Sequence, residues 1–380
     1  MKRKILFVTE RRADYSKLRP VINEIKKSKK FEYYLIVTGS HLLKKHGYTI
    51  NEIKKDGFQI YKKFKMFEEN DDDSPSTMTM GFGKAVIKLT KIIKTLKPDL
   101  IFSGFDIGAN FAAAVIGAHM NIHVAHLEGG EITGTIDESI RHAISKFAHI
   151  HFTSNEQATK RLIKMGELSE NIFTVGNPSL DVIKSLKIIS KKKLENEFNI
   201  NFDKPLLLIV QHTVTTEINK IDKYFLETIN AIKETNYQSI IISGNADAGS
   251  QRIKKIIKNS NILNYENLPF IKYISLLYYS SAIIGNSSSG IMEAPFLHIP
   301  SINIGTRQEG RGKTESIMNV KYDKHEIKMA INKTLTDKKF LNSIKNQKNE
   351  HGNGTASKKI IQILEKLNFE NISIQKKLAY

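Results

Sequence analysis

The chain has 380 residues, of which 40% are hydrophobic and 26% are charged, and it contains no cysteine. This balance is typical of globular proteins and excludes wholesale disorder, collagen-like structure, disulfides and thiolate metal sites. No apolar run approaches the ~18 residues of a membrane span, and the apolar run Ile5–Val8 is shorter than the roughly 7 residues of a secretory signal. We therefore expect a cytoplasmic protein, and the length predicts two domains.

The net charge of +19 raises the question of a nucleic-acid or membrane partner. Nucleic-acid-binding proteins gather Lys and Arg on one face or arm, often with stacking aromatic residues. Here the lysines are spread over nearly every amphipathic stretch, and only nine of the 58 basic residues are arginine. The pattern predicts a weak general attraction for anions, with neither nucleic acid nor membrane as a partner.

Short apolar runs alternate with longer amphipathic stretches along the whole chain. The predicted strands are residues 5–8, 34–37, 100–103, 123–126, 151–153, 172–175, 206–210, 239–243, 282–285 and 301–304. The predicted helices are residues 16–29, 82–96, 109–119, 139–147, 156–165, 220–233, 250–258, 271–279, 290–296 and 358–367. Near-continuous apolar strands between helices are typical of parallel sheets covered on both faces, so each half is expected to be an α/β, doubly wound, Rossmann-like domain.

The pattern breaks at Gly176-Asn-Pro178, which predicts a hinge. The expected domains are residues 1–177 and 178–357, with a C-terminal helix within 358–380 packing back on the first domain. In doubly wound sheets, ligands bind beyond the carboxyl ends of the strands. A cleft between the two domains is therefore the expected site.

Two polar clusters follow predicted strands of the first half. Thr9–Ser16 leads into a helix, whose free N–H groups and neighbouring arginines suit a phosphate; helix capping with surface arginines is the alternative. His126–Glu138 holds four carboxylates and three glycines, and Asp106 is expected to point at the same cleft. Carboxylates that share a cleft have separated pKa values, so some can act as acids and others as bases. The alternative for this cluster is a capping Asp137 within an exposed acidic loop.

The second half carries further polar clusters after its strands. Gly285–Glu293 is a Ser/Gly turn followed by a helix with an acid in its first turn. This arrangement suits a diphosphate and ribose hydroxyls, or simply caps the helix. His212 could bind phosphate or be a buried, satisfied histidine. Asn245–Ser250, Arg307 and Arg311 follow the two remaining strands.

Five histidines lie between His123 and His151. They do not form the i, i+4 pair with a nearby carboxylate that is typical of zinc sites. We expect structural roles for them, with no metal and no cofactor.

Seven motifs stand out along the chain. They are Arg12-Ala-Asp-Tyr-Ser-Lys17, Thr38-Gly-Ser-His41, His126-Leu-Glu-Gly-Gly-Glu131, Gly134-Thr-Ile-Asp-Glu-Ser-Ile-Arg-His-Ala-Ile-Ser-Lys146, Asn245-Ala-Asp-Ala-Gly-Ser250, Gly285-Asn-Ser-Ser-Ser-Gly290 and Gly305-Thr-Arg-Gln-Glu-Gly-Arg311. In order and spacing, over residues 1–365, the chain resembles the hydrolysing branch of the nucleotide-sugar 2-epimerases. This branch includes bacterial enzymes of sialic and legionaminic acid biosynthesis and the epimerase half of the mammalian bifunctional enzyme.

The resemblance implies the GT-B-like fold of nucleotide-sugar glycosyltransferases, with the nucleotide in the cleft between two domains. It implies that Asp106, Glu128 and Asp137 carry the chemistry. The residues that it implies for binding a UDP- or GDP-sugar are Arg12, Ser16, His212, Asn245, Ser287, Ser288 and Glu293, with His41, Glu131, Arg307 and Arg311 as further candidates. For assembly it implies a homodimer or a dimer of dimers.

Two stretches depart from the family pattern. In the family, Gly-Asp-Arg-x-Glu is common after the strand that contains Ser103. This chain keeps the aspartate as Asp106 but has Ile107 in place of the arginine and Ala109 in place of the acid. Glu10-Arg11 stands where Gly-Thr is usual. We expect the loss of a charged pair beside the sugar to make the pocket more apolar, which suits a 6-deoxy sugar. The predicted substrate is UDP- or GDP-N,N'-diacetylbacillosamine, converted to 2,4-diacetamido-2,4,6-trideoxymannose; UDP-N-acetylglucosamine, giving N-acetylmannosamine, is the alternative.

The resemblance further implies anti elimination of the nucleoside diphosphate to a 2-acetamidoglycal, followed by hydration. Such a reaction needs a base and a proton donor at C2, a base for water at C1, and positive charge at the diphosphate. Three other hypotheses remain: a GT-B glycosyltransferase, which would not need three carboxylates at the sugar; a non-hydrolysing epimerase, whose usual His-x-Glu-Ala-Gly differs from His126–Glu131; and a nucleic-acid-binding protein without catalysis.

Overall fold

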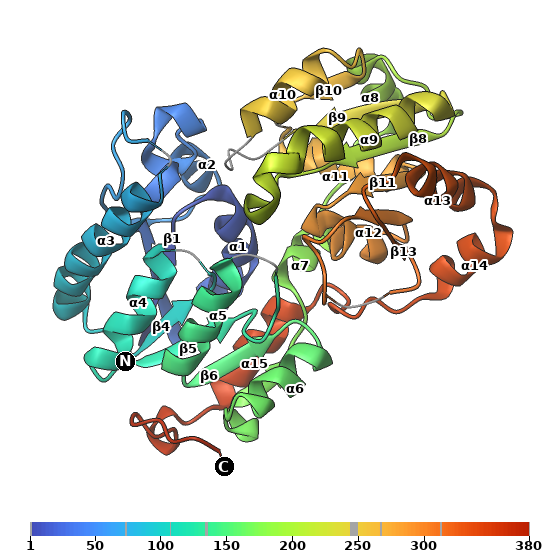
Figure 1. Ribbon diagram of the computed structural model, residues 1–380. Coiled ribbons are helices and arrows are strands. Elements are labelled where there is room, and N and C mark those ends of the chain that lie inside the picture. The colour runs from blue at the N-terminus through green and yellow to red at the C-terminus, as the bar shows by residue number, and fades with distance from the viewer. Residues whose placement is uncertain are drawn as a thin grey trace. The chain divides into compact units, whose positions relative to one another are not determined.

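The computed structural model describes residues 2–72, 74–106, 108–133, 136–243, 250–266, 268–311 and 314–379. The chain divides into two compact units (Figure 1). Unit 1 comprises residues 1–131, 136–182 and 351–380, and unit 2 comprises residues 132–135 and 183–350. None of the helices in the described ranges combines the length and the apolarity that crossing a membrane requires.

Unit 1 is built on a parallel sheet with the strand order β3-β2-β1-β4-β5-β6-β7. Its strands are β1 (Arg3–Thr9), β2 (Phe31–Val37), β3 (Ile60–Lys63), β4 (Leu100–Ser103), β5 (His123–Leu127), β6 (Ile150–Thr153) and β7 (Ile172–Thr174). The central strands are apolar on both faces because helices cover both faces. Phe7 of β1 packs in one core and its neighbour Leu6 packs in another.

The helices of unit 1 divide between these two cores. α1 (Arg12–Lys27) and α15 (Ala356–Lys366) cover one face, and α3 (Pro75–Leu96), α4 (Gly108–His119) and α5 (Ile136–Phe147) cover the other. The shorter helices are α2 (Ile50–Lys55), α6 (Glu156–Lys164) and α7 (Pro178–Ser185), with 3-10 turns at Gly39–Leu42, Lys44–His46, Ser169–Asn171 and Phe369–Asn371.

Unit 2 repeats the plan with the parallel strand order β10-β9-β8-β11-β12-β13. Its strands are β8 (Leu206–Val210), β9 (Gln238–Ile242), β10 (Leu263–Tyr265), β11 (Ala282–Gly285), β12 (Ser301–Ile304) and β13 (Ile317–Val320). Its helices are α8 (Lys191–Phe198), α9 (Ile221–Thr235), α10 (Ser250–Lys258), α11 (Phe270–Tyr279), α12 (Glu293–Phe296), α13 (Lys324–Thr336) and α14 (Lys338–Asn346), with 3-10 turns at Thr215–Lys220 and Ser288–Gly290. The predicted fold class, two doubly wound parallel α/β domains, is confirmed.

Three strands are not predicted from the sequence, and all three lie at sheet edges. β3, β10 and β13 are half-exposed or exposed along their lengths. An edge strand has a neighbour on one side only and fewer helices over its faces, so its sequence lacks the continuous apolar run of a central strand.

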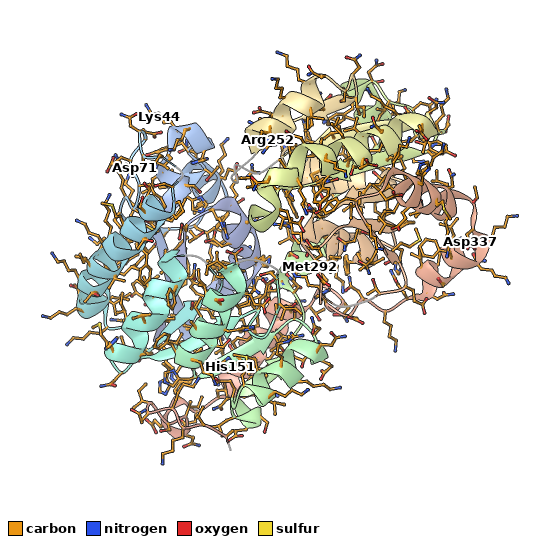
Figure 2. All side chains as sticks on the ribbon, in the orientation of Figure 1. Lys44, Asp71, His151, Arg252, Met292 and Asp337 are labelled. Carbon is orange, nitrogen blue, oxygen red and sulfur yellow. The ribbon has the colours of Figure 1, made fainter. Side chains whose placement is uncertain are left out.

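The C-terminal segment returns to unit 1, where Lys376 forms an ion pair with the buried Glu167. Glu167 accepts a hydrogen bond from His151 at 3.2 Å and forms an ion pair with Lys376 at 2.5 Å; Figure 2 labels His151. Burial alone would raise the pKa of Glu167, but the hydrogen bond from His151 and the charge of Lys376 outweigh it and lower the pKa to about 2.

The helix that makes this return is capped from another segment of unit 1. Asp181 of α7 accepts hydrogen bonds from the backbone N–H groups of Ala356 (2.9 Å) and Ser357 (2.6 Å) at the start of α15. A carboxylate at this place satisfies otherwise unpaired N–H groups and interacts favourably with the helix dipole. Asp181 therefore fixes α15 on the sheet.

Replacing Asp181 with Ala is expected to lower the free energy of unfolding by ~1–2 kcal/mol, because two N–H groups of α15 lose their acceptor. Chemical denaturation measures the loss, and hydrogen exchange of α15 locates it. Asp337→Ala is the matched control, since Asp337 caps α14 in unit 2 through the N–H groups of Lys339 and Phe340. Faster exchange in α15 of the control, or none in Asp181→Ala, would contradict this role.

Candidate active site

The carboxyl ends of β1 and β4 lie beside each other in unit 1. The helices that follow them, α1 and α4, cover opposite faces of the sheet. In doubly wound sheets a ligand-binding crevice opens at such a point. Glu10–Arg12 and Gly104–Asp106 occupy it here.

Asp106 lies just beyond β4 and forms an ion pair with Arg141 of α5. Arg141 is 5% exposed, and its Nη1 also donates to the backbone oxygen of Glu131 at 2.9 Å. Asp137 precedes Arg141 by four residues on the same helix, so the two side chains lie on one side of α5. Arg141 thus brings Asp106 to the helix face that carries Asp137.

Glu128, one of the three expected catalytic carboxylates, is held by Lys17 and Asn177. It is 8% exposed, lies 2.8 Å from the Nζ of Lys17 through each of its oxygens, and accepts a 2.6 Å hydrogen bond from Asn177 Nδ2. Its backbone has a φ of +62°, a left-handed conformation that costs a non-glycine residue on the order of 1–3 kcal/mol. Backbone strain of this kind concentrates at functional sites, which supports a role for Glu128 beyond packing.

Glu131 points back into unit 1. It is 4% exposed and accepts a 2.6 Å hydrogen bond from Asn155, whose own Oδ1 caps α6 at Ala158 N. The structure therefore gives Glu131 a contact that holds the 128–131 loop against α6. Its contact with a substrate stays a prediction.

His41 and Asp14 form a buried layer behind the β1 loop. The hydroxyl of Thr9 donates to Asp14 (2.7 Å) and so must accept from His41 Nε2 (3.0 Å), which leaves His41 Nδ1 to accept from Thr49 (2.7 Å). Burial lowers the pKa of His41 to about 4 and raises the pKa of Asp14 to about 6. His41 is therefore a neutral histidine with both ring nitrogens engaged by protein groups, and its predicted substrate contact stays untested.

The first turns of α1 carry Arg12 and Ser16. Arg12 Nε lies 3.4 Å from Glu52 of α2, with both side chains well exposed. Ser16 donates to the backbone oxygen of Ala13 at 2.8 Å. The Arg12–Glu52 pair is a surface ion pair, which contributes little and leaves the guanidinium able to exchange Glu52 for a ligand anion.

The expectation of a more apolar pocket rests on Ile107 and Ala109. Ile107 lies outside the described residues, and Ala109 is fully buried in the core beneath α4, so its side chain lines no pocket. Oε2 of Glu10 accepts a hydrogen bond from Ala109 N at 2.9 Å. An acid from the end of β1 thus reaches the start of α4, where the family pattern has an acid of its own, and Arg11 accompanies it.

In unit 2, Asn286 joins the carboxyl ends of β8 and β11. Its Oδ1 accepts from His212 N (2.7 Å) and its Nδ2 donates to His212 O (2.9 Å). Arg307 and Gln308 donate to the backbone oxygen of Asn286 at 3.0 and 2.9 Å. Burial, assisted by the charge of Arg307, lowers the pKa of His212 to about 3, so its imidazole is neutral at pH 7.

The serine turn after β11 is closely packed. Ser287 Oγ accepts from Ser289 N at 3.3 Å, and a Cβ on Gly290 would lie 2.5 Å from Ser301 Oγ, so a side chain there would require Ser301 to move. Ser287 and Ser288 are partly exposed, whereas Glu293, at the start of α12, is 9% exposed.

Two other predicted binding residues of unit 2 differ in what the structure describes. Arg311 donates to Ile132 O (2.9 Å) and Gln308 Oε1 (3.0 Å), which are loop contacts within the unit. Asn245 lies outside the described residues. Among the described residues, no cluster of three or more His, Asp or Glu side chains is arranged to hold a metal ion.

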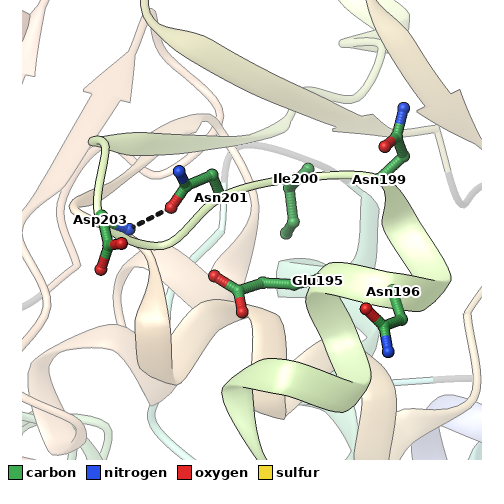
Figure 3. Close-up of a pocket in the computed structure, with 6 residues that line it drawn as sticks. All are labelled: Glu195, Asn196, Asn199, Ile200, Asn201 and Asp203. Carbon is green, nitrogen blue, oxygen red and sulfur yellow. Dashed lines mark hydrogen bonds between the residues drawn. The ribbon is translucent and has the colours of Figure 1, made fainter.

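A surface depression of unit 2 lies away from these residues (Figure 3). It is lined by Glu195, Asn196, Asn199, Ile200, Asn201 and Asp203. Asn201 accepts from Asp203 N at 2.7 Å, and Glu195 accepts from Phe202 N at 2.8 Å. These polar groups shape the turn before β8, at the amino edge of the sheet, so the depression does not belong to the ligand-binding edge.

Sequence reasoning missed the partners of the carboxylates. Arg141 and Lys17 lie within the motifs and Asn177 lies in the predicted hinge, yet nothing in their sequence context said which acid each would contact. The available signal was an arginine inside an otherwise acidic motif, at the i+4 position from Asp137.

Comparison with known proteins gives the relationship directly. Residues 23–365 match the family described as UDP-N-acetylglucosamine 2-epimerase. The UDP-N,N'-diacetylbacillosamine 2-epimerase (hydrolyzing) of Legionella pneumophila is 34% identical, with both chains covered completely, and the GDP/UDP-N,N'-diacetylbacillosamine 2-epimerase (hydrolyzing) of Campylobacter jejuni is 36% identical over 84% of each chain.

Solved structures share the fold. The UDP-GlcNAc 2-epimerase of Neisseria meningitidis, bound to UDP-GlcNAc, superposes with a TM-score of 0.83 at 21% identity, covering 96% of this chain and all of that one. A 2-epimerase structure from Listeria monocytogenes also gives 0.83, at 18% identity over 100% of this chain and 99% of that one. With the match over nearly its whole length, the chain belongs to the UDP-N-acetylglucosamine 2-epimerase family.

Proposed function

We propose that the protein is a hydrolysing 2-epimerase that converts UDP- or GDP-N,N'-diacetylbacillosamine to 2,4-diacetamido-2,4,6-trideoxymannose and the free nucleoside diphosphate. The observation that carries the proposal is the set of carboxylates Asp106, Glu128 and Asp137 in unit 1, with Arg141 paired to Asp106 and Lys17 paired to Glu128. The two hydrolysing diacetylbacillosamine epimerases at 34% and 36% identity support this substrate, which would place the enzyme in legionaminic acid biosynthesis.

The chemistry follows from the acidity of the sugar. The C2 proton is too weakly acidic for a carboxylate to remove it alone, so cleavage of the C1–O bond must accompany or precede its removal. The departing diphosphate takes the bonding electrons, the C2 proton passes to a carboxylate, and a 2-acetamidoglycal forms. Water then adds oxygen to C1 while a proton is delivered to the opposite face of C2, which inverts that centre.

Each unit has residues suited to one part of this reaction. Unit 1 supplies acids and bases, and each proton transfer by a positioned group contributes on the order of 10²–10⁴-fold. Unit 2 supplies Arg307 and the N–H groups of the serine turn, which suit a phosphate. His212 would act as a neutral hydrogen-bond donor rather than as a cation, since its pKa is about 3.

The second candidate is hydrolysis of UDP-N-acetylglucosamine to N-acetylmannosamine and UDP. It is favoured by the 31% identity to the UDP-N-acetylglucosamine 2-epimerase of Neisseria meningitidis over 99% of this chain. The charged groups Glu10 and Arg11 at the β1 loop also weaken the argument that a 6-deoxy sugar is required.

A proton NMR time course in D₂O tests the proposal, with each of the three nucleotide sugars offered separately. We expect release of nucleoside diphosphate without an acceptor, and a manno-configured sugar carrying deuterium at C2, fastest with a diacetylbacillosamine donor. An intact epimerised nucleotide sugar would establish the non-hydrolysing reaction instead. Release that requires an acceptor would establish a glycosyltransferase.

Replacing Asp106 or Glu128 should affect the elimination and the hydration of the glycal to different extents. Asp106→Asn and Glu128→Gln are each expected to lower kcat by on the order of 10²–10⁴-fold with the fold retained. Adding 2-acetamidoglycal directly tests hydration alone, so a variant that hydrates the glycal but does not form it has lost the elimination base.

The matched control is Asp99→Asn. Asp99 is an exposed aspartate at the opposite, amino edge of the same sheet, where it accepts from Lys4 N at 2.7 Å. Full activity is expected for this variant. Wild-type rates in both Asp106→Asn and Glu128→Gln would exclude these carboxylates from the reaction.

A further inference from the structure

We propose that Glu217 is a positioning residue that holds the loop carrying Arg307 in place to bind the diphosphate of the substrate. The inference rests on the proposed function for the phosphate-binding role of Arg307. The contacts that support it lie within unit 2, among the loops that follow β8, β12 and β13. The carboxylate of Glu217 joins all three of these loops.

Glu217 receives one hydrogen bond on each carboxylate oxygen. The hydroxyl of Thr306, in the loop after β12, donates to Oε1 at 2.8 Å, and the hydroxyl of Tyr322, after β13, donates to Oε2 at 3.2 Å. Burial and the nearby charge of Glu217 raise the pKa of Tyr322, so its hydroxyl keeps the proton that it donates. Both partners are therefore donors, which suits a carboxylate because an ionised carboxylate only accepts.

Tyr322 is closely packed on both sides. Its ring stacks on Tyr224 of α9, with the ring centroids 3.9 Å apart and an angle of 3° between the planes. It also lies against Gly305, the first residue after β12, where an added Cβ would be 2.1 Å from Tyr322 Cζ. Tyr322 therefore holds Glu217 from a fixed position, next to the point where the loop of Arg307 leaves the sheet.

Arg307 occupies a tight turn whose first residue is Thr306. Glu309 N donates to Thr306 O at 2.9 Å, which closes a four-residue turn with Arg307 and Gln308 at its centre. Arg307 Nη1 and Gln308 Nε2 donate to the backbone oxygen of Asn286 at 3.0 and 2.9 Å. Asn286 directly precedes the serine turn, so these contacts place the guanidinium beside the expected phosphate site.

The turn is thus held at its start by Glu217 and at its centre by Asn286. Thr306 is exposed, so without Glu217 its hydroxyl would bond to water and the start of the turn would gain freedom. That freedom must be lost again when a phosphate binds, and this ordering cost weakens binding. Glu217 therefore acts on the diphosphate through Arg307 and contacts no ligand atom itself.

Calorimetric titration with UDP, and separately with GDP, tests the proposal. Glu217→Ala and the nearly isosteric Thr306→Val both remove the contact and are each expected to raise the Kd by about 5–10-fold. Thr306→Ser, which keeps a hydroxyl, should retain the wild-type Kd. Glu234→Ala is the matched control with an unchanged Kd, because Glu234 lies near the end of α9 and pairs with Lys324 and Lys328.

A double-mutant cycle separates positioning from direct ligand contact. In the Arg307→Met background, Glu217→Ala should raise the Kd by less than about 2-fold, because Glu217 acts through Arg307. A full additional loss in that background would make Glu217 a ligand contact and overturn the proposal. An unchanged Kd in Thr306→Val would also overturn it, and this variant removes only one surface hydroxyl, so it decides the question even if Glu217→Ala destabilises unit 2.

The titrations also distinguish this proposal from the proposed function. If the wild type bound UDP or GDP and the variants behaved as expected, but the D₂O time course showed no turnover, the role of Glu217 would stand and the proposed function would fail. If the wild type bound neither nucleotide, the phosphate-binding role of Arg307 would fail, and the role of Glu217 with it.

Discussion

The contacts that fix Glu128 are the constraint on which the carboxyl edge of the unit 1 sheet depends. Lys17 comes from α1, Glu128 from the end of β5, and Asn177 from the segment after β7, so one carboxylate joins three parts of unit 1. Asn177 N also donates to His351 O at 2.7 Å, where the chain re-enters the unit. Because these charge-assisted bonds fix the side chain from two directions, they can offset the strain of its left-handed backbone.

The two parallel sheets place different chemistry at equivalent edges. In unit 1 the carboxyl edge collects acids, among them Asp106 and Glu128, whose directions are fixed by the cations Arg141 and Lys17. In unit 2 the same edge collects donors: the neutral imidazole of His212, the guanidinium of Arg307 and the serine turn. A histidine that stays neutral is compatible with Arg307 beside it, since an imidazolium there would be repelled by the guanidinium and poorly hydrated.

The central strands and most of the longer helices could be predicted from sequence because their signals are local. Continuous apolar runs mark strands buried on both faces, and polar clusters directly after them mark the ligand edge. The partners could not be predicted, since Lys17 and Glu128 are 111 residues apart, Asn177 and Glu128 are 49 apart, and Arg141 and Asp106 are 35 apart. Only the folded sheet brings them together. The edge strands β3, β10 and β13 were not predicted because half-exposed strands lack a continuous run of apolar residues.

Glu10 shows that a residue lost from one loop can be supplied by a residue far away in the sequence. The loop after β4 lacks the arginine and the acid of the family pattern, and this loop alone predicts a less charged pocket. In space, however, that loop borders the end of β1, and the acid at the start of α4 is supplied by Glu10 from there. The loops after β1 and β4 lie beside each other because these strands are neighbours in the sheet, so either loop can supply a charged side chain at this point. The charge at this edge of the sheet therefore depends on both loops, since Glu10 brings from the end of β1 an acid that the loop after β4 lacks.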